Sequence, residues 1–113
     1  MLPTREIPEP LLRQLLTAGT AIGANLEEAK SAYSRRELAA KYAISLKASR
    51  ECLYWLRLFT ADRPSIADMT EPLIDDCDQL IATLTTTVRK LKLVAVIQAT
   101  AVLIVILLFV SHF

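Results

Sequence analysis

Hydrophobic positions between residues 10 and 92 recur at steps of three and four, a spacing that predicts amphipathic helices. Three periodic stretches occupy residues 10–31, residues 34–60 and the segment from about residue 70 onward. There is no strand-like alternation, and the five prolines lie before, between or at the starts of the periodic stretches. The pattern therefore predicts an all-α chain of three amphipathic helices, with a linker over about residues 61–69.

The first predicted helix carries an apolar stripe with small and polar residues on it or beside it. Gly19 and Gly23 lie one turn apart, and each costs about 1 kcal/mol in a helix relative to alanine. The pair therefore predicts close approach of a neighbouring helix backbone. A phosphate-binding loop is the alternative, but a preceding strand and a third glycine are missing. Asn25 and Glu28 are either solvated or a polar pair that bonds across helices and fixes their register.

The second predicted helix begins with a capping box, in which Ser34 accepts from the amide of Glu37 and the glutamate reaches back. It carries two apolar rows, which predicts neighbouring helices on two sides. Trp55 belongs to the second row, and we expect it in the core rather than in an aromatic cofactor site. The rows are Leu38, Tyr42, Leu46, Leu53 and Leu56, and Ile44, Ala48, Cys52, Trp55 and Phe59.

A basic row occupies the remaining face of the second helix. Three interpretations are open: a solvated surface, ion pairs with Asp75 and Asp76 at the acidic start of the third helix, or contact with nucleic-acid phosphates. The row consists of Arg36, Lys47, Arg50 and Arg57.

The third predicted helix begins near Thr70, with Pro72 at an early turn and acidic residues at the positive end of the helix dipole. These carboxylates suit the dipole and solubility better than a metal site. A coiled-coil-like seam follows, and nothing interrupts the helix before the apolar end of the chain. The seam consists of Leu73, Cys77, Leu80, Leu84, Val88 and Leu91.

Residues 93–110 form an uncharged run of eighteen residues, in which only Gln98 and Thr100 are polar. As a helix this run rises roughly 27 Å, close to the hydrocarbon thickness of a bilayer. It predicts a C-terminal membrane anchor, with residues 1–92 as the bundle module and residues 93–113 as the apolar helix. A helix buried in an oligomer, and a disordered or artefactual end, are the alternatives.

The flanking charges predict an orientation for this anchor. Arg89, Lys90 and Lys92 precede the run, and only Ser-His-Phe follows it, so the module is expected on the cytoplasmic side. The opening residues lack the apolar stretch of a signal peptide, which also predicts a cytosolic N-terminal part. If the run does not span a membrane, the chain is expected in the cytoplasm.

Composition argues against catalysis and metal binding. The net charge is +1, and the single histidine, His112, is the penultimate residue. Cys52 and Cys77 lie at apolar helical positions and are expected to be reduced core residues. Three scattered Cys and His residues are too few for a zinc site, and a single histidine at the penultimate position makes a Cys–His or Ser–His–Asp arrangement implausible. We therefore expect no enzymatic activity, catalytic residue, cofactor or metal.

The segment GTAIGANLEEA, followed by SRRELAAKYAISLKASRECLYWLRLF, resembles a specific group of proteins. These are the bacterial four-helix-bundle proteins encoded in intervening sequences of 23S ribosomal RNA genes. Accessory proteins of diversity-generating retroelements share their architecture. The segment LIDDCDQLIATLTTTVRKLK is similar to the last helix of the family, and the resemblance covers about residues 8–92.

The resemblance implies an antiparallel four-helix bundle that assembles into rings, often pentamers, without known enzymatic activity. Gly19, Gly23, Asn25 and Glu28 match the helix-packing motif of the family, and a second signature is matched by Glu51, Tyr54 and Trp55. Two features depart from the family pattern. Only about nine residues precede the small-residue helix, so the first helix is shortened, and an uncharged run of eighteen residues replaces a short polar tail.

Two functional hypotheses follow. The first is a non-catalytic, self-associating helical bundle that acts as a scaffold or interaction module and is tethered to a membrane by its C-terminal helix. The second is a soluble, ring-forming accessory protein for nucleic acid or a reverse transcriptase, with Arg36, Lys47, Arg50 and Arg57 on the contact face. The strongly basic surface of the nucleic-acid-binding relatives is absent here, which favours the first.

Overall fold

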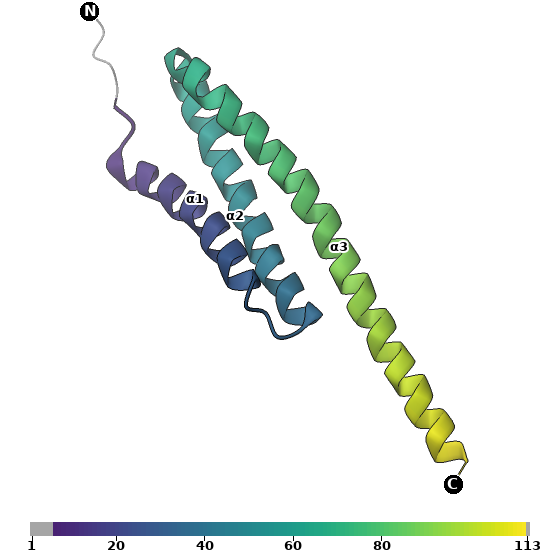
Figure 1. The fold of residues 1–113 in the computed structure, drawn as a ribbon. Helices are drawn as coiled ribbons and strands as arrows, with labels where there is room; N and C mark the ends of the chain where they lie inside the picture. Colours follow the sequence, from purple (N-terminus) through teal and green to yellow (C-terminus); the bar gives the residue numbers. More distant parts are fainter. Residues whose placement is uncertain (1–5, 113) are drawn as a thin grey trace, which may run out of the picture.

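The structure is a computed structural model that describes residues 6–112. It contains three α-helices and one 3₁₀ turn, and no strand occurs within these residues. In chain order they are α1 (Glu9–Ala29), α2 (Arg35–Asp62), the 3₁₀ turn η1 (Pro64–Ile66) and α3 (Ala67–Ser111), as Figure 1 shows. The prediction of an all-helical chain is therefore confirmed.

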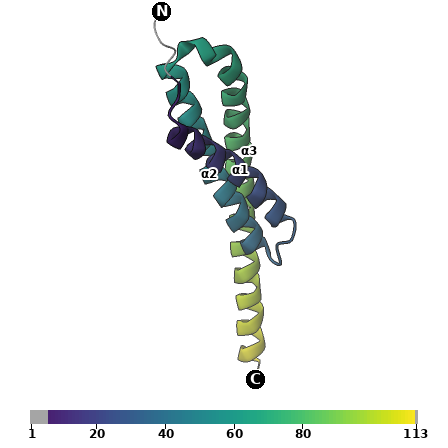
Figure 2. The same cartoon turned by 90° about the vertical axis from the view of Figure 1, so that its left-hand side faces the viewer.

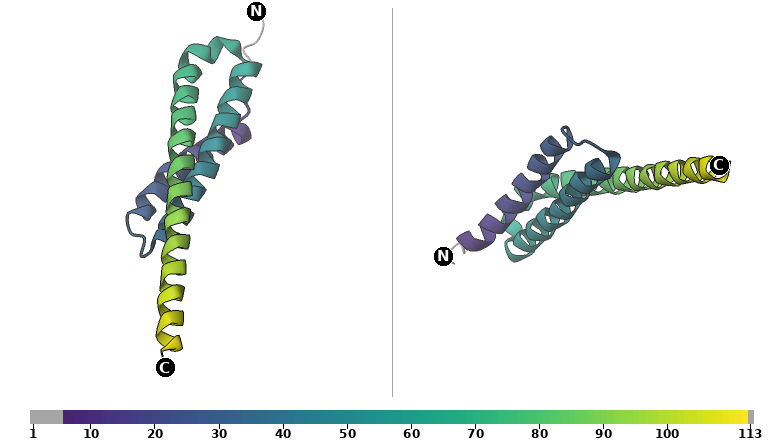
Figure 3. Two further views of the ribbon diagram at one scale, coloured as in Figure 1. Left: turned by 90° about the vertical axis from the view of Figure 1, so that its right-hand side faces the viewer. Right: turned by 90° about the horizontal axis from the view of Figure 1, so that it is seen from below.

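Helix α2 is the central element, because it packs against both α1 and α3. The chain folds back at each of the two connections, and the second half of α3 projects beyond the other helices (Figures 1 and 2). The molecule is consequently long and narrow, with extents of 86 × 20 × 17 Å (Figure 3). The two apolar rows of α2 predicted this central position.

The start of α2 follows the predicted capping box with one difference. Ser34 Oγ accepts a hydrogen bond from the Glu37 amide at 3.0 Å. The Glu37 carboxylate, however, accepts from the amide of Tyr33 at 2.9 Å, one residue before the cap. Both bonds still satisfy backbone donors that a helix start leaves open, so the helix begins where the sequence predicted.

The predicted linker over residues 61–69 is wrong in its extent. Helix α2 continues to Asp62, η1 follows, and α3 begins at Ala67, three residues before the expected Thr70. Pro72 consequently lies inside α3 rather than in its first turn. A 2.6 Å hydrogen bond between the Thr60 and Thr70 hydroxyls ties the end of α2 to α3. This bond joins two polar side chains that the hydrophobic pattern does not register.

The core lies where α1, α2 and α3 meet. Its buried centre consists of Ala18, Cys52, Leu53, Leu56 and Cys77, and Leu15, Ile22, Ile74 and Ile81 pack against it. Farther along α3, Leu84 and Val88 are also buried, at 4% and 6% exposure. The seam predicted for the third helix is therefore confirmed from Cys77 to Val88, whereas Leu73 is half exposed.

Helix α3 runs without a break into the apolar run, as the sequence predicted. The helical segment Pro64–Ser111 contains an eighteen-residue window with a mean hydropathy of 3.0, and none of that window is buried. By length and composition, α3 is therefore able to cross a membrane. Apolar helices of this kind also occur in soluble proteins, although there they are mostly buried.

Candidate interaction surfaces

Helix α1 contacts α2 through small buried side chains. Ser45 and Ser49 of α2 are fully buried, and Ala18 and Ala29 of α1 are 2% and 4% exposed. Ser45 Oγ donates a 2.9 Å hydrogen bond across the interface to the carbonyl oxygen of Ile22. Within α2, Ser49 Oγ donates to the carbonyl oxygen of Ser45 at 2.8 Å. These serines bring the two helices together and satisfy their own hydroxyl donors in the core.

The sequence analysis did not single out the two serines. A recognisable signal existed, because small residues recur along α2 at steps of three and four. This row consists of Ser45, Ala48, Ser49 and Cys52. Such a row lets a neighbouring helix approach closely, and it differs from the solvated face that serines usually occupy.

The two glycines of α1 do not make the close contact that the sequence predicted within this chain. A Cβ added at Gly19 or Gly23 would meet nothing within 4 Å, and both residues are exposed. The close approach to α2 occurs instead at Ala18, one position away from Gly19. The 3.6-residue period places Ala18 on the inner face of α1, whereas the predicted stripe ran through its neighbour.

Gly19 borders an apolar groove of about 330 Å³ that runs between α1, α2 and α3. The walls are almost entirely hydrophobic, with Asp76 and Thr20 as the polar exceptions. Hydrophobic residues from all three helices line it: Leu15, Leu16, Cys52, Leu56, Leu73, Cys77 and Leu80. Leu16 is 65% exposed and Leu73 is 46% exposed, so the groove presents apolar surface to solvent.

Asn25 and Glu28 take separate roles rather than forming one polar pair. Asn25 Nδ2 donates to the carbonyl oxygen of Ala21 within α1 at 2.8 Å. The Glu28 carboxylate bonds across the interface to Lys41 Nζ of α2 at 2.5 Å. This hydrogen bond, with the charge of Glu28, raises the pKa of Lys41 above its ordinary value. Glu28 thus joins α1 to α2, but at an exposed edge.

Trp55 is half buried and belongs to an aromatic cluster on α2. Its ring centroid lies 5.9 Å from that of Phe59, at an interplanar angle of 32°. The Tyr54 ring meets the indole edge-on, with centroids 5.0 Å apart. The neighbouring Phe59 is 4% exposed, so the buried aromatic side chain of the second apolar row is Phe59 rather than Trp55.

The basic row of α2 is exposed at all four positions, Arg36, Lys47, Arg50 and Arg57. Arg57 forms a 3.6 Å ion pair with Asp78 of α3, one turn beyond the expected Asp75. Within residues 6–112, no ion pair joins the row to Asp75 or Asp76. Of the three interpretations, pairing with α3 therefore occurs at Arg57 only and uses a different carboxylate, while the row is solvated at the other three positions.

Cys52 and Cys77 are both free and buried, as the sequence predicted. Burial raises the pKa of the Cys77 thiol from 9.0 to about 12, and the adjacent Cys52 adds to the effect by charge and by a hydrogen bond. A thiol with so high a pKa holds almost no thiolate near neutral pH, and thiolate is the reactive form. Cys77 is therefore a core side chain rather than a reactive thiol, and Cys52 is buried in the same core cluster.

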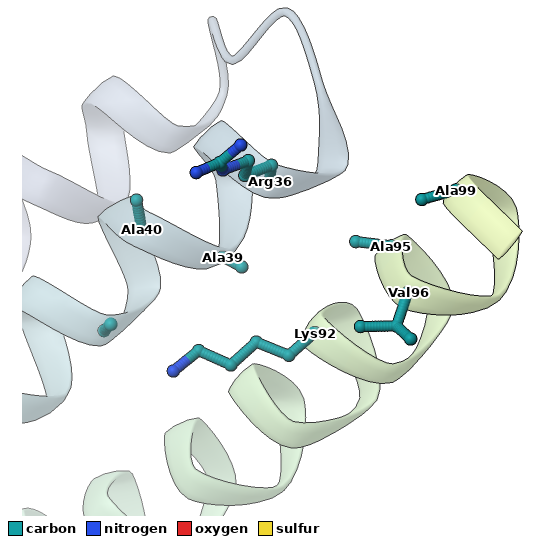
Figure 4. A pocket seen from close by; sticks show the side chains of 8 residues that line it. Arg36, Ala39, Ala40, Lys92, Ala95, Val96 and Ala99 are labelled. Atoms are coloured by element: carbon teal, nitrogen blue, oxygen red, sulfur yellow. The ribbon is translucent and has the colours of Figure 1, made fainter.

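A second cleft, of about 630 Å³, opens where the start of α2 faces α3 (Figure 4). Arg36 of α2 and Lys92 of α3 stand on its opposite sides, and its walls are otherwise apolar. The sequence could not reveal this cleft, because it joins residues more than fifty positions apart. Within residues 6–112, no group of three or more His, Cys, Asp and Glu side chains could hold a metal ion.

Comparisons with known proteins agree with this architecture. A family model described as 23S rRNA-intervening sequence protein matches residues 5–86. A crystal structure of a protein of unknown function from the S23 ribosomal protein family of Bacteroides thetaiotaomicron is similar at 32% identity, with a TM-score of 0.65. That similarity covers 69% of this chain and 72% of the other. No curated protein matches the chain.

Proposed function

This chain belongs to the 23S rRNA-intervening sequence protein family, and we propose that it is a non-catalytic, self-associating bundle tethered to a membrane by residues 93–110. Its bundle would act as a scaffold or interaction module. In this proposal the three helices are of the antiparallel four-helix-bundle type. The apolar run lies beyond residue 86, where the family match ends, so tethering would be an addition to the family fold.

The exposure of the apolar run is the single observation that carries the tether. Nine consecutive residues, 102–110, are large and apolar, and their exposed fractions range from 51% to 66%. Nine successive positions cover every face of a helix, so this segment is apolar all round rather than along one stripe. Burying each such side chain contributes roughly 1.5–3 kcal/mol. A lipid environment covers all faces at once, which a single packing seam would not.

The charges that precede the run support one orientation. Arg89 and Lys90 are exposed at the end of the bundle, and Lys92 is the last charge before the run. Basic residues beside a span favour the cytoplasmic side, so we place the bundle there.

Self-association is supported by the apolar groove beside Gly19. The groove lies on the bundle, away from the proposed membrane segment, and it exposes Leu16 and Leu73. A second copy would cover this surface, and the open space at Gly19 would let its helix approach closely. The resemblance described above suggests a pentameric ring for such an assembly.

Flotation of cell membranes tests the tether. On a density gradient the full chain should float with the membranes and should resist an alkaline carbonate wash. The double variant Ile104→Lys, Leu107→Lys should not float, because each lysine costs about 2.5–3.5 kcal/mol at the centre of a span. The matched variant Ile104→Leu, Leu107→Ile should float normally. A wild-type chain recovered as a defined soluble oligomer without detergent would refute the tether.

A soluble, ring-forming accessory protein for nucleic acid or a reverse transcriptase is the second candidate. It is favoured by the exposed basic row, in which Arg36, Lys47 and Arg50 have no acidic partner among the described side chains. Binding of RNA or single-stranded DNA should then weaken steeply with salt. The variant Lys47→Gln, Arg50→Gln should reduce it, and the absence of any complex at low salt would remove this candidate.

A further inference from the structure

The cleft at the start of α2 is distinct from the groove beside Gly19. On the α2 side it is lined by Arg36 and three alanines, and on the α3 side by Lys92 and Val96 with two more alanines. Figure 4 shows Ala95 and Ala99 facing the start of α2, with Lys92 extending along the opening. Small side chains on both helices leave the space between the two backbones unfilled, so the cleft is open and apolar.

Two unpaired cations stand at this apolar cleft. Neither Arg36 nor Lys92 forms an ion pair or a hydrogen bond with another side chain in the described part of the protein. The nearby carboxylate of Glu37 is occupied by the Tyr33 amide. Arg36 lies in the first turn of α2, at the positive end of the helix dipole. The opening therefore suits an anion, while the walls suit hydrocarbon.

The position of the cleft along α3 matches the surface of a bilayer. Lys92 immediately precedes the apolar run, and from Lys92 to Ala99 the helix rises about 10 Å. The polar layer of a bilayer is about 5–7 Å thick on each side. A span that begins at residue 93 would thus place Lys92 among the head groups, and Ala95 and Ala99 at the start of the acyl chains.

The α1–α2 connection supports the same placement. It lies at the end of the bundle from which α3 projects (Figures 1 and 2). Tyr33 in this connection is 97% exposed, and Lys30 and Arg35 are exposed beside it. Tyrosine and basic residues are typical of the membrane–water interface, where the ring and the charges both find partners.

We propose that this cleft binds one anionic glycerophospholipid, with its phosphate between Arg36 and Lys92 and an acyl chain along Ala95 and Ala99. The inference rests on the proposed membrane tether and adds to it a lipid class and a site. The bound lipid would fill the space between α2 and α3 and thereby fix the angle at which the bundle stands on the membrane.

Native mass spectrometry of the full-length protein released from detergent micelles tests this site. We expect adducts of dioleoyl phosphatidylglycerol to exceed those of dioleoyl phosphatidylcholine, which has the same chains but no net charge. Arg36→Gln with Lys92→Gln should lower phosphatidylglycerol binding about tenfold or more, because each basic side chain adds to the electrostatic attraction for the anionic lipid. Arg50→Gln with Arg57→Gln removes the same charge elsewhere on α2 and should leave binding unchanged.

A second matched pair of variants tests the apolar part of the site. Ala95→Leu should reduce the phosphatidylglycerol adduct by filling the cleft, whereas Ala101→Leu, on the apolar run outside the cleft, should not. Glycerol 3-phosphate should form no adduct, since it lacks acyl chains. Equal binding of both lipids, full binding by the Arg36 and Lys92 double variant, or equal binding of glycerol 3-phosphate would overturn the proposal.

Membrane flotation of the same variants distinguishes a failure of the lipid site from a failure of the membrane tether. All of them should float, because none introduces a charge into the apolar run. A chain that floats but shows no preference for phosphatidylglycerol would refute the lipid site alone. A wild-type chain that does not float would refute the tether and, with it, the site.

Discussion

At the scale of single residues, the bundle depends on small polar side chains buried where α1 contacts α2. Ser45 and Ser49 are the most buried side chains of the described structure, and each has a carbonyl partner. Only a small residue fits at such a contact, and its hydroxyl needs a partner once water is excluded. Ser45 is the more informative of the two, because its bond crosses from α2 to α1.

Substitutions at Ser45 should therefore separate the hydrogen bond from the packing. Ser45→Ala should lower the free energy of unfolding by about 1 kcal/mol, the net value of one buried bond. Ser45→Leu should lower it further, by roughly 1–3 kcal/mol, because the larger side chain forces the helices apart. Urea denaturation in mild detergent, followed by circular dichroism, measures both. Ser65→Ala, at an exposed position, is the control, and an unchanged Ser45→Leu variant would refute the close contact.

The raised pKa of Cys77 makes stability depend on alkaline pH. The folded protein holds this proton more tightly than the unfolded chain, whose thiol titrates near 9.0. The stabilisation is therefore complete below pH 9 and is lost as the pH rises toward about 12. Denaturation curves should show a steeper loss of stability in this range for the wild type than for Cys77→Ala. Equal slopes would show that the thiol titrates normally.

The role of a residue could be predicted from the sequence only where that residue and its near neighbours in the chain determine the role. Ser34 and Glu37 lie within four positions of each other, so their cap was readable directly. Asn25 was ambiguous, because the sequence does not show whether its amide faces a neighbour or its own helix. The Thr60–Thr70 bond and the cleft at Arg36 depend on how α2 and α3 meet, which local spacing does not encode.

At the scale of elements, α3 has two environments along one uninterrupted helix. Its first half packs a seam against α2, and its second half is apolar on every face. Periodicity predicted this change, because the spacing of about 3.5 residues stops where the charges stop. The helix start was mispredicted, since the prolines at 64 and 72 suggested a longer linker than the chain forms. Proline is tolerated within the first turns, so it marks helix starts only approximately.

The cap at the start of α2 gives a test at this scale. Ser34→Ala should lower the free energy of unfolding by about 1 kcal/mol, because the Glu37 amide loses its acceptor. Ser34→Asp should restore most of the loss, since a carboxylate also caps. Ser31→Ala, an exposed serine in the same connection, serves as the control in urea denaturation. A Ser34→Ala variant as stable as wild type would show that the end of the helix frays.

At the scale of the whole molecule, the groove beside Gly19 and the end of α3 both expose apolar surface, and we expect different partners to cover them. The groove beside Gly19 is a local channel between three helices, whereas the end of α3 is apolar all round. We propose a second copy for the groove and lipid for the helix end. The sequence predicted excess apolar surface and assigned Gly19 and Gly23 to helix packing or oligomerisation. Within this chain a Cβ added at either glycine meets no neighbouring atom within 4 Å, so their role in oligomerisation stays a prediction.

Gly19→Leu tests the proposed assembly. A leucine side chain would occupy the groove and keep a second copy away, so the mass of the detergent-solubilised protein should fall toward that of a monomer. Leucine favours helix more than glycine does, and the helical content should not decrease. Light scattering coupled to size-exclusion chromatography gives the mass. Ala24→Leu, at an exposed position of α1 outside the groove, should keep the wild-type mass, and an unchanged Gly19→Leu mass would contradict the assignment.

The central claim is that lipid covers residues 93–110, and fluorescence quenching in liposomes tests it most directly. Leu103→Trp adds an indole near the middle of the run, and the signal of the wild-type chain with Trp55 alone is subtracted. Phosphatidylcholine brominated in mid-chain should quench the added tryptophan strongly and leave Trp55 nearly unaffected. If the fluorescence of the added tryptophan is instead the same in brominated and ordinary lipid, protein or water covers this helix and the account is wrong.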